Sequence, residues 1–292
     1  MKVFNKIADL RAYLHECRAK NQKIGFVPTM GALHQGHLAL VERAKSEVEI
    51  AVCSIYVNPT QFNNPTDLEK YPRTLENDKK LLETVFCDVL FVPENEEMYP
   101  EKNILKFDFG TLETVMEGRF RPGHFNGMAT VVCKLFNIVQ PNKAYFGQKD
   151  LQQYMVVRQF IADLSFPIEL VCYPIVREKD GLAMSSRNKR LTPTQREIAP
   201  KLYEALLMAQ KIIQNQQENQ KENNTRTTLE IKAEILSFLK SIEGIKVEYF
   251  EIVAQNTLIS LDDTATFSEK TSIALCVAAL LGEVRLIDNL LL

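Results

Sequence analysis

Short β-rich runs alternate with helical patterns over the first 175 residues of this 292-residue chain. The β-rich runs lie at residues 24–29, 50–57, 88–92, 143–146 and 168–173, and the helical patterns at 38–46, 67–84 and 127–139. Strands that alternate with helices favour a parallel sheet covered by helices on both faces. The first part of the chain is therefore predicted to be an α/β domain built on such a sheet.

The pattern changes after about residue 175. Two helical patterns follow at 194–214 and 228–242, and β-rich runs follow at 245–254, 272–279 and 283–288. Helices followed by strands predict a second, smaller α+β domain, so the expected domains are 1–175 and 176–292. The polar spacer 214–225 between the two helices is expected to be an exposed, mobile loop.

Composition and charge argue against nucleic acid and membrane as partners and favour a cytoplasmic protein. The formal net charge is -2, so no global basic field favours nucleic acid or an anionic membrane. The six cysteines are scattered without a Cys-x-x-Cys pair, as expected for reduced thiols in a cytoplasmic protein. The charged N-terminus does not read as a signal peptide, and no apolar stretch is long enough to cross a bilayer.

The motif most informative about function follows the β-rich run at 24–29 and contains His34 and His37. A turn with two glycines leads through these histidines into an amphipathic helix, which places imidazoles and backbone N–H groups where phosphate binds well. The alternative is a pair of surface or capping histidines. The preceding strand, the glycine-rich turn and the following helix together favour phosphate.

Two further motifs follow other predicted strands. The run from Asn58 to Gln61 is rich in amides, which suit a small ligand with hydroxyl and carboxylate groups, although an ordinary Asn-Pro turn is an equal alternative. Gly147 permits close backbone approach to a ligand, and Lys149 suits phosphate. Asp150 is expected either to accept from ribose hydroxyls or to cap the next helix.

The remaining motifs are more ambiguous. The loop from Arg119 to Gly127 is basic and glycine-containing. It could touch phosphate or close over a site, but we expect a mainly structural or subunit-contact role, with His124 as a hydrogen-bonding residue. The run from Met184 to Asn188 places two hydroxyls beside a guanidinium, which makes either a compact anion clamp or a serine-rich linker between domains.

Together these motifs resemble the pantothenate synthetase family, also called pantoate–β-alanine ligases, within the nucleotidylyltransferase superfamily. Five motifs in order carry the resemblance: 28–37, 58–62, 121–124, 147–150 and 184–188. It extends from about residue 1 to the C-terminus and is loosest over 214–225. It implies a Rossmann-like, doubly wound N-terminal domain that binds ATP and pantoate, a smaller C-terminal lid domain, and a cytoplasmic homodimer.

The resemblance also implies the reaction and its residues. ATP and Mg²⁺ would drive condensation of (R)-pantoate with β-alanine through a pantoyl-adenylate. His37 is the expected catalytic residue, assisted by His34, Lys149 and Arg187. The expected ATP-binding residues are Met30, Gly31, Ala32, Leu33, His34, Gln35, Gly36, His37, Gly147, Gln148, Lys149, Asp150, Val176, Met184, Ser185, Ser186 and Arg187, and the expected substrate-binding residues are Asn58, Gln61 and Gln153.

Three details complete these expectations. Gln148 stands where many relatives carry Glu, and we expect little consequence because it lies between the contacting residues. Mg²⁺ is expected to bind the phosphates and water, so no protein ligands are assigned. No serine or cysteine nucleophile is expected.

Three other functions are compatible with parts of the sequence. Another nucleotidylyltransferase would use an acceptor site rich in Arg and Lys, whereas the amides of Asn58, Gln61 and Gln153 favour a small hydroxy acid. A tRNA synthetase would need a large basic surface that this chain lacks. A nucleotide-binding regulator that has lost catalysis is disfavoured because the expected catalytic residues are all present: His34, His37, Lys149 and Arg187.

Overall fold

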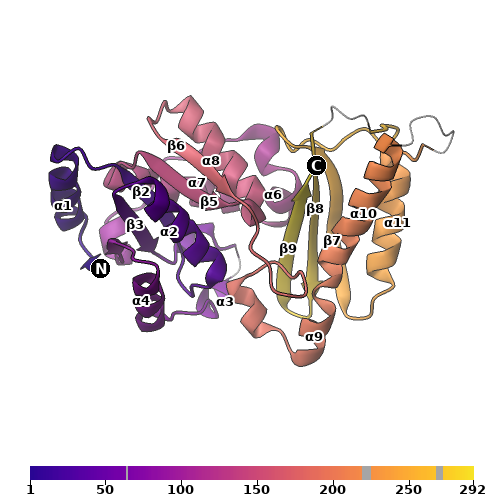
Figure 1. Ribbon diagram of the computed structural model, residues 1–292, viewed down its shortest axis with the longest axis horizontal. Coiled ribbons are helices and arrows are strands. Elements are labelled where there is room, and N and C mark those ends of the chain that lie inside the picture. Colours follow the sequence, from indigo (N-terminus) through magenta and orange to yellow (C-terminus); the bar gives the residue numbers. More distant parts are fainter. Residues whose placement is uncertain (64, 219–224, 268–271) are drawn as a thin grey trace. The chain divides into compact units, whose positions relative to one another are not determined.

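The structure is a computed structural model that describes residues 1–63, 65–218, 225–267 and 272–292 (Figure 1). The chain forms two compact units. Unit 1 comprises Met1–Glu113, Arg121–Gln148 and Gln153–Pro174. Unit 2 comprises Thr114–Phe120, Lys149–Gln152 and Ile175–Leu292. The segments 114–120 and 149–152, which the sequence assigns to the first domain, therefore group with unit 2.

Unit 1 is built on a six-stranded parallel sheet with the order β1-β4-β3-β2-β5-β6. Its strands are β1 (Lys2–Phe4), β2 (Ile24–Thr29), β3 (Ile50–Ile55), β4 (Val89–Phe91), β5 (Lys143–Gly147) and β6 (Glu169–Tyr173). The predicted doubly wound α/β sheet is confirmed.

Alternate residues of each strand face opposite layers of helices. In β2, Phe26 packs with α1 (Ile7–Ala19), α7 (His124–Val139) and α8 (Leu151–Asp163). Val27 packs with α2 (Gln35–Glu47) and α4 (Leu75–Thr84) on the other face. Helices cover both faces, which explains why the central strands read as nearly continuous apolar runs.

The strand order places a switch point beside β2. From β2 the chain passes to β3 and β4 on one side, and then returns to β5 and β6 on the other. In open α/β sheets, ligands bind beyond the carboxyl ends of the strands where the order reverses. The turn after β2 and the end of β5 therefore lie at the edge where a ligand is expected.

Unit 2 contains an antiparallel sheet with the order β7-β8-β9. Its main elements are α9 (Pro193–Ile198), α10 (Lys201–Glu218), α11 (Thr228–Lys240), β7 (Ile245–Ala254), β8 (Ile273–Leu281) and β9 (Val284–Leu291). Apolar residues of α10 and α11 pack with the strands in one core. The predicted smaller α+β part is confirmed.

The short elements are mostly single turns. They are α3 (Pro65–Glu69), α5 (Asn95–Met98), α6 (Met116–Phe120) and the 3₁₀ turns η1 (Pro59–Gln61), η2 (Gly110–Glu113), η3 (Gln148–Asp150) and η4 (Ser186–Arg190).

All eight predicted strands are present, but two predicted helices are broken. The pattern at 67–84 divides into α3 and α4, with Pro72 between them, and that at 194–214 divides into α9 and α10 at Pro200. Proline lacks the N–H that a helix interior needs and disfavours helix at the preceding residue. The prediction of a loop over 214–225 is wrong for residues 214–218, which continue α10, and residues 219–224 lie outside the described residues.

The cysteines are all free, and four of the six are buried: Cys17, Cys53, Cys87 and Cys276. Burial raises the pKa of the Cys172 thiol to about 11 and that of Cys87 to about 12. In the described part of the chain, no helix combines the length and apolarity needed to span a bilayer.

We predict slow alkylation of the native thiols. At pH 8 a thiol with a pKa near 12, such as that of Cys87, is ionised only to about one part in ten thousand, and only the thiolate reacts. Iodoacetamide followed by mass spectrometry should leave Cys53, Cys87 and Cys276 unmodified in native protein, while all six react in guanidinium. Rapid native modification of these three would contradict the burial.

Candidate functional site

The turn after β2 carries the run that begins at Met30. The Thr29 hydroxyl donates to the Ser54 carbonyl (2.7 Å) and accepts from the Gly31 N–H (3.2 Å). Gly31 has φ +79° and Ala32 has φ +50°. The second of these is a left-handed conformation that a residue with a Cβ adopts only when its surroundings enforce it. The turn therefore needs contacts that hold it.

Those contacts come from Asp78 of α4, whose side chain is fully buried. Its two carboxylate oxygens accept from the N–H groups of Ala32 and Leu33, each at 2.9 Å. The Thr74 hydroxyl donates to the same carboxylate at 3.0 Å. Sequence analysis missed Asp78, although an acid at the spacing Leu75, Asp78, Leu82 on an apolar helix stripe is a readable signal.

The two histidines cap α2. His34 Nδ1 accepts from the Gly36 N–H (3.1 Å), and His37 Nδ1 accepts from the His34 N–H (3.3 Å). Their ring centroids are 4.0 Å apart. An Nδ1 that accepts carries no hydrogen, so this hydrogen-bond network assigns the hydrogen of each neutral ring to Nε2. Both histidines therefore cap the helix, as in the capping alternative, and they do so through Nδ1.

Asn58 anchors the turn η1. Its Nδ2 donates to Gln61 Oε1 and to the Gly127 carbonyl, both at 3.1 Å, and its Oδ1 accepts from the hydroxyls of Thr60 (3.0 Å) and Tyr99 (3.1 Å). The side chain is 1% exposed. Both of its polar atoms are engaged by the protein, so its geometry suits a residue that positions Gln61.

His124 and Gly127 of α7 fix the same turn from the other side. His124 is buried, and its Nδ1 lies 2.9 Å from the Gln61 carbonyl oxygen. A Cβ on Gly127 would lie 2.2 Å from the Thr60 carbonyl oxygen. The expected structural role of His124 is present, but the loop expected to reach Gly127 ends where α7 begins at His124. Gly127, inside the helix, permits the close approach of helix and turn.

The predicted substrate-binding amides differ in their surroundings. Gln61 is buried, and its Nε2 donates to Met30 Sδ at 3.2 Å, which joins η1 to the turn after β2. Gln153 is half-buried in the first turn of α8. Within the described part of the chain, the Gln153 side chain makes no hydrogen bond and none joins it to Gln61.

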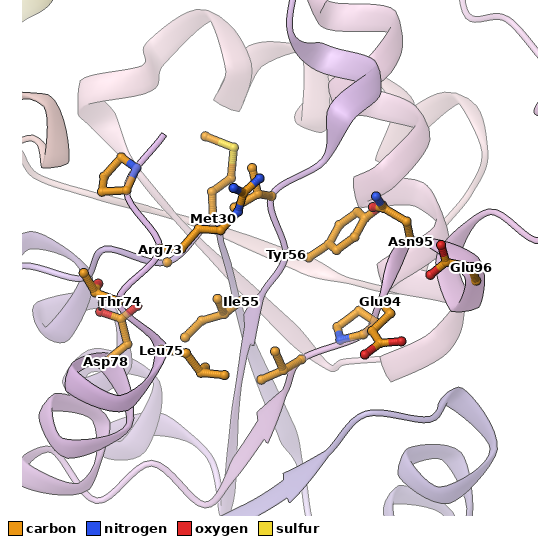
Figure 2. Close-up of a pocket in the computed structure, with 15 residues that line it drawn as sticks. Met30, Ile55, Tyr56, Arg73, Thr74, Leu75, Asp78, Glu94, Asn95 and Glu96 are labelled. Atoms are coloured by element: carbon orange, nitrogen blue, oxygen red, sulfur yellow. Dashed lines mark hydrogen bonds between the residues drawn. The ribbon is translucent and has the colours of Figure 1, made fainter. Parts of the chain in front are cut away.

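A cavity of about 400 Å³ adjoins the turn after β2. Asp78 and Thr74 lie on one side of it, Glu94, Asn95 and Glu96 lie on the other, and Ile55 is between them (Figure 2). Of the predicted site residues, only Met30 and Gly31 line this cavity. The cavity therefore extends from the turn after β2 toward the ends of β3 and β4.

In unit 2, the predicted anion clamp is a turn stabilised by its own backbone. The Met184 N–H donates to the Val176 carbonyl (3.0 Å), which brings these two predicted residues together. The Ser185 hydroxyl accepts from the Arg187 N–H (3.2 Å) and caps η4. Ser186 is buried and Arg187 is half-buried. The run from Met184 to Asn188 thus forms an ordered, hydrogen-bonded turn.

Lys149 and Asp150 open the chain segment that groups with unit 2. The Asn289 side chain donates to the Lys149 carbonyl (3.0 Å), and Lys149 Nζ lies 4.0 Å from Asp150 Oδ2. The Asp150 side chain is half exposed. It accepts no hydrogen bond from the first turn of α8 in the residues described, so the capping alternative is not what the structure contains.

A buried ion pair next to this segment was missed by sequence analysis. Both guanidinium NH groups of Arg177 donate to Asp288 (2.6 and 2.9 Å), and the guanidinium carbon lies 3.7 Å from the Tyr203 ring centroid. Burial raises the pKa of Asp288, which the charge of Arg177 opposes. Asp288 precedes Asn289, so this pair fixes the strand that holds Lys149.

A second buried network ties α6 to the three-stranded sheet. Arg285 donates to both oxygens of Glu117 (2.6 and 2.8 Å), and the Tyr249 hydroxyl donates to Glu117 (2.8 Å). Gln152 accepts from the Glu117 N–H at 3.0 Å. Burial alone would lower the pKa of Arg285, but its ion pairs with Glu117 and Glu248 raise it. These contacts explain why 114–120 and 149–152 group with unit 2.

The donor groups around the turn after β2 favour an anion over a metal ion. In the ranges that the structure describes, no group of three or more His, Cys, Asp or Glu side chains is arranged to hold a metal ion. The Asp78 carboxylate is already engaged by the N–H groups of Ala32 and Leu33 and by the Thr74 hydroxyl. The start of α2 and its two imidazoles are the groups there that suit an anion.

Gly127→Ala tests the close approach of α7 to η1. The added methyl group must displace the backbone of Thr60, so we expect a loss of about 1–3 kcal/mol in the free energy of unfolding, although alanine ordinarily favours a helix. Thermal denaturation measures this. Gly147→Ala is the matched control for stability, because a Cβ there meets nothing within 4 Å. Equal melting temperatures for the two variants would contradict the packing.

Comparison with known protein families covers nearly the whole chain. The profile of the family described as pantoate-beta-alanine ligase matches residues 2–291. The pantothenate synthetase of Cytophaga hutchinsonii is 46% identical over 286 residues, which is 98% of this chain and 97% of the relative. That of Thermotoga petrophila is 46% identical over 292 residues, with both chains fully covered.

Solved structures give the same result. The crystal structure of pantothenate synthetase from Thermus thermophilus has a TM-score of 0.88 and 44% identity, and the match covers 99% of each chain. A pantoate-beta-alanine ligase from Francisella tularensis, described as complexed with beta-gamma ATP and beta-alanine, has a TM-score of 0.78 and 38% identity, covering 100% of this chain and 97% of that one.

Proposed function

The chain belongs to the pantoate–β-alanine ligase family, and from this premise we propose that it condenses (R)-pantoate with β-alanine in an ATP-dependent reaction. The products are pantothenate, AMP and pyrophosphate. The observation that carries the proposal for this chain's own residues is the turn after β2. There, His34 and His37 cap α2 through Nδ1 and keep Nε2 as the hydrogen-bearing nitrogen at the carboxyl end of a switch-point strand.

This arrangement supports a phosphate site. The first backbone N–H groups of a helix and its positive dipole end stabilise an anion, and an Nε2–H donor adds to that field. We assign the ATP phosphates to Met30, Gly31, Ala32, Leu33, His34, Gln35, Gly36 and His37. The remaining ATP contacts are assigned to Gly147, Gln148, Lys149, Asp150, Val176, Met184, Ser185, Ser186 and Arg187.

We assign the binding of pantoate, the acid that accepts AMP, to side-chain amides. Gln61 is assigned to pantoate and β-alanine, and Gln153 to pantoate, since a carboxamide matches both the hydroxyls and the carboxylate of pantoate. The saturated hydrogen bonding of Asn58 changes its expected role from a direct contact to the support of Gln61. An acceptor bearing phosphate would instead call for arginine and lysine at these positions.

The chemistry follows in two balanced steps. A carboxylate oxygen of pantoate attacks the α-phosphorus, and pyrophosphate leaves with the electrons of the broken P–O bond. The amine of β-alanine then attacks the acyl-adenylate carbonyl, loses a proton and expels AMP. Both first-step reactants are anionic, so neutralisation of charge by His34, His37, Lys149 and Arg187 is the main task of the protein. No protein nucleophile takes part.

Mg²⁺ would supply further charge neutralisation on the phosphates when bound. It keeps several waters and prefers phosphate oxygens, and the N–H and imidazole donors of the turn are suited to the phosphates rather than to the ion. We therefore propose that Mg²⁺ arrives with ATP. The further proposals of a lid role for residues 176–292, a homodimer and a cytoplasmic location rest on the family resemblance.

The proposed reaction is tested by its dependence on both acids. Purified protein is incubated with ATP, Mg²⁺ and pantoate, with and without β-alanine, and AMP and pantothenate are measured by chromatography. AMP and pantothenate in equal amounts only when both acids are present support the ligase. ATP binding without turnover under every condition would instead indicate a regulatory nucleotide-binding protein.

The histidine pair gives a sharper prediction. Asparagine at position 34 can still cap α2 but has no Nε2, so His34→Asn should keep its melting temperature while its pantoate-dependent ATP–pyrophosphate exchange falls by about 10²–10³-fold. His37→Ala should lose exchange to a similar extent. Isotope exchange at saturating substrate measures both.

The control is the exposed His15 of α1. His15→Ala should exchange at the wild-type rate. Near-normal exchange in both His34→Asn and His37→Ala would remove the pair from the mechanism while leaving the family assignment intact.

A further inference from the structure

We propose that Asp78 is a positioning residue for catalysis, which holds the turn at residues 31–34 in the conformation that presents the histidines to ATP. This inference rests on the proposed function of the turn and extends it to a residue on α4, a helix that contributes none of the assigned ligand contacts. Asp78 acts through the backbone of Ala32 and Leu33 and contacts no substrate itself.

The burial of Asp78 indicates a dedicated role. Its carboxylate is fully buried, and within the part of the chain described here no Lys, Arg or His forms an ion pair with it. A buried charge without a counter-charge is costly unless several hydrogen bonds replace its hydration. Here two backbone N–H groups and the Thr74 hydroxyl do so. Ordinary packing at this position on α4 would be served better by leucine.

The backbone of the turn explains what the carboxylate achieves. Gly31 at φ +79° and Ala32 at φ +50° turn successive N–H groups toward one point, where the carboxylate receives the N–H groups of Ala32 and Leu33. Without Asp78, these two buried N–H groups would lose their acceptor, and Ala32 would gain by leaving the left-handed region.

The effect reaches the histidines directly. Leu33 precedes His34, whose own N–H donates to His37 Nδ1. A change of backbone direction at 32–33 therefore moves the start of α2 and the paired rings together. A misplacement of about 1 Å in such a site is enough to cost about 10²-fold in rate.

The experiment compares Asp78→Asn with a double variant. Asparagine offers one acceptor oxygen and sets an NH₂ group against the second N–H, so we expect kcat for pantoate-dependent exchange to fall by about 10- to 100-fold. Glycine adopts φ +50° without strain, so Ala32→Gly combined with Asp78→Asn should recover kcat by about threefold or more. A residue that served only overall stability would not be rescued in kcat by this change.

Asp88→Asn is the matched control. Asp88 accepts from the Ala51 N–H (2.7 Å) and pairs with Lys45, but it precedes β4 at the amino-terminal edge of the same sheet. We expect this variant to lower the melting temperature and leave kcat at the wild-type value. If Asp78→Asn is insoluble, Thr74→Val replaces it, with an expected fall in kcat of about threefold.

The outcomes separate the two hypotheses. Wild-type protein that performs no exchange would overturn the proposed function. Active wild-type protein, together with an Asp78→Asn variant that keeps the wild-type kcat and loses only melting temperature, would overturn the positioning role. An unchanged kcat in Thr74→Val, where that variant is the one available, would overturn it as well.

Discussion

The pairing of β2 with β3 on one side and β5 on the other is the constraint on which the rest of unit 1 depends. Both faces of this strand are buried, so a shift of one residue would move Phe26 and Val27 into the wrong cores. The register also fixes where the strand ends. Thr29, its last residue, donates to the carbonyl of Ser54 in the neighbouring strand and thereby fixes the start of the following turn to the sheet.

Much of the fold and of the candidate site could be predicted because it depends on residues that are close together in the sequence. The buried strands are apolar runs bounded by turns, and the histidine, amide and serine motifs are contiguous, so their places at strand ends could be read directly. What could not be read depends on contacts distant in sequence. Asp78 meets Ala32 across 46 residues, and Gly127 matters only because Thr60 lies against it. The edge strand β1 was missed because it has only three residues.

The polar residues of the candidate site fall into two classes: those that support neighbouring groups and those proposed to contact the ligand. Asn58, Asp78 and His124 are buried, and their side chains contact neighbouring backbone and side-chain groups. The proposed phosphate contacts His34 and His37 each use Nδ1 in the helix cap. Motif reading cannot tell these two classes of residue apart, because both are polar and both occur beside turns. Hydrogen-bond geometry separates them.

The pairing of β1 with β4 has a consequence for how the protein is made. Lys2 pairs with Val89, so the first strand has no partner until 87 more residues have left the peptidyl-transferase centre. At ordinary synthesis rates that delay is about 4 to 17 s. During it β1 has no neighbouring strand in the growing chain. Strand β1 thus waits for β4 before it can join the sheet, whereas β5 and β6 are synthesised later still.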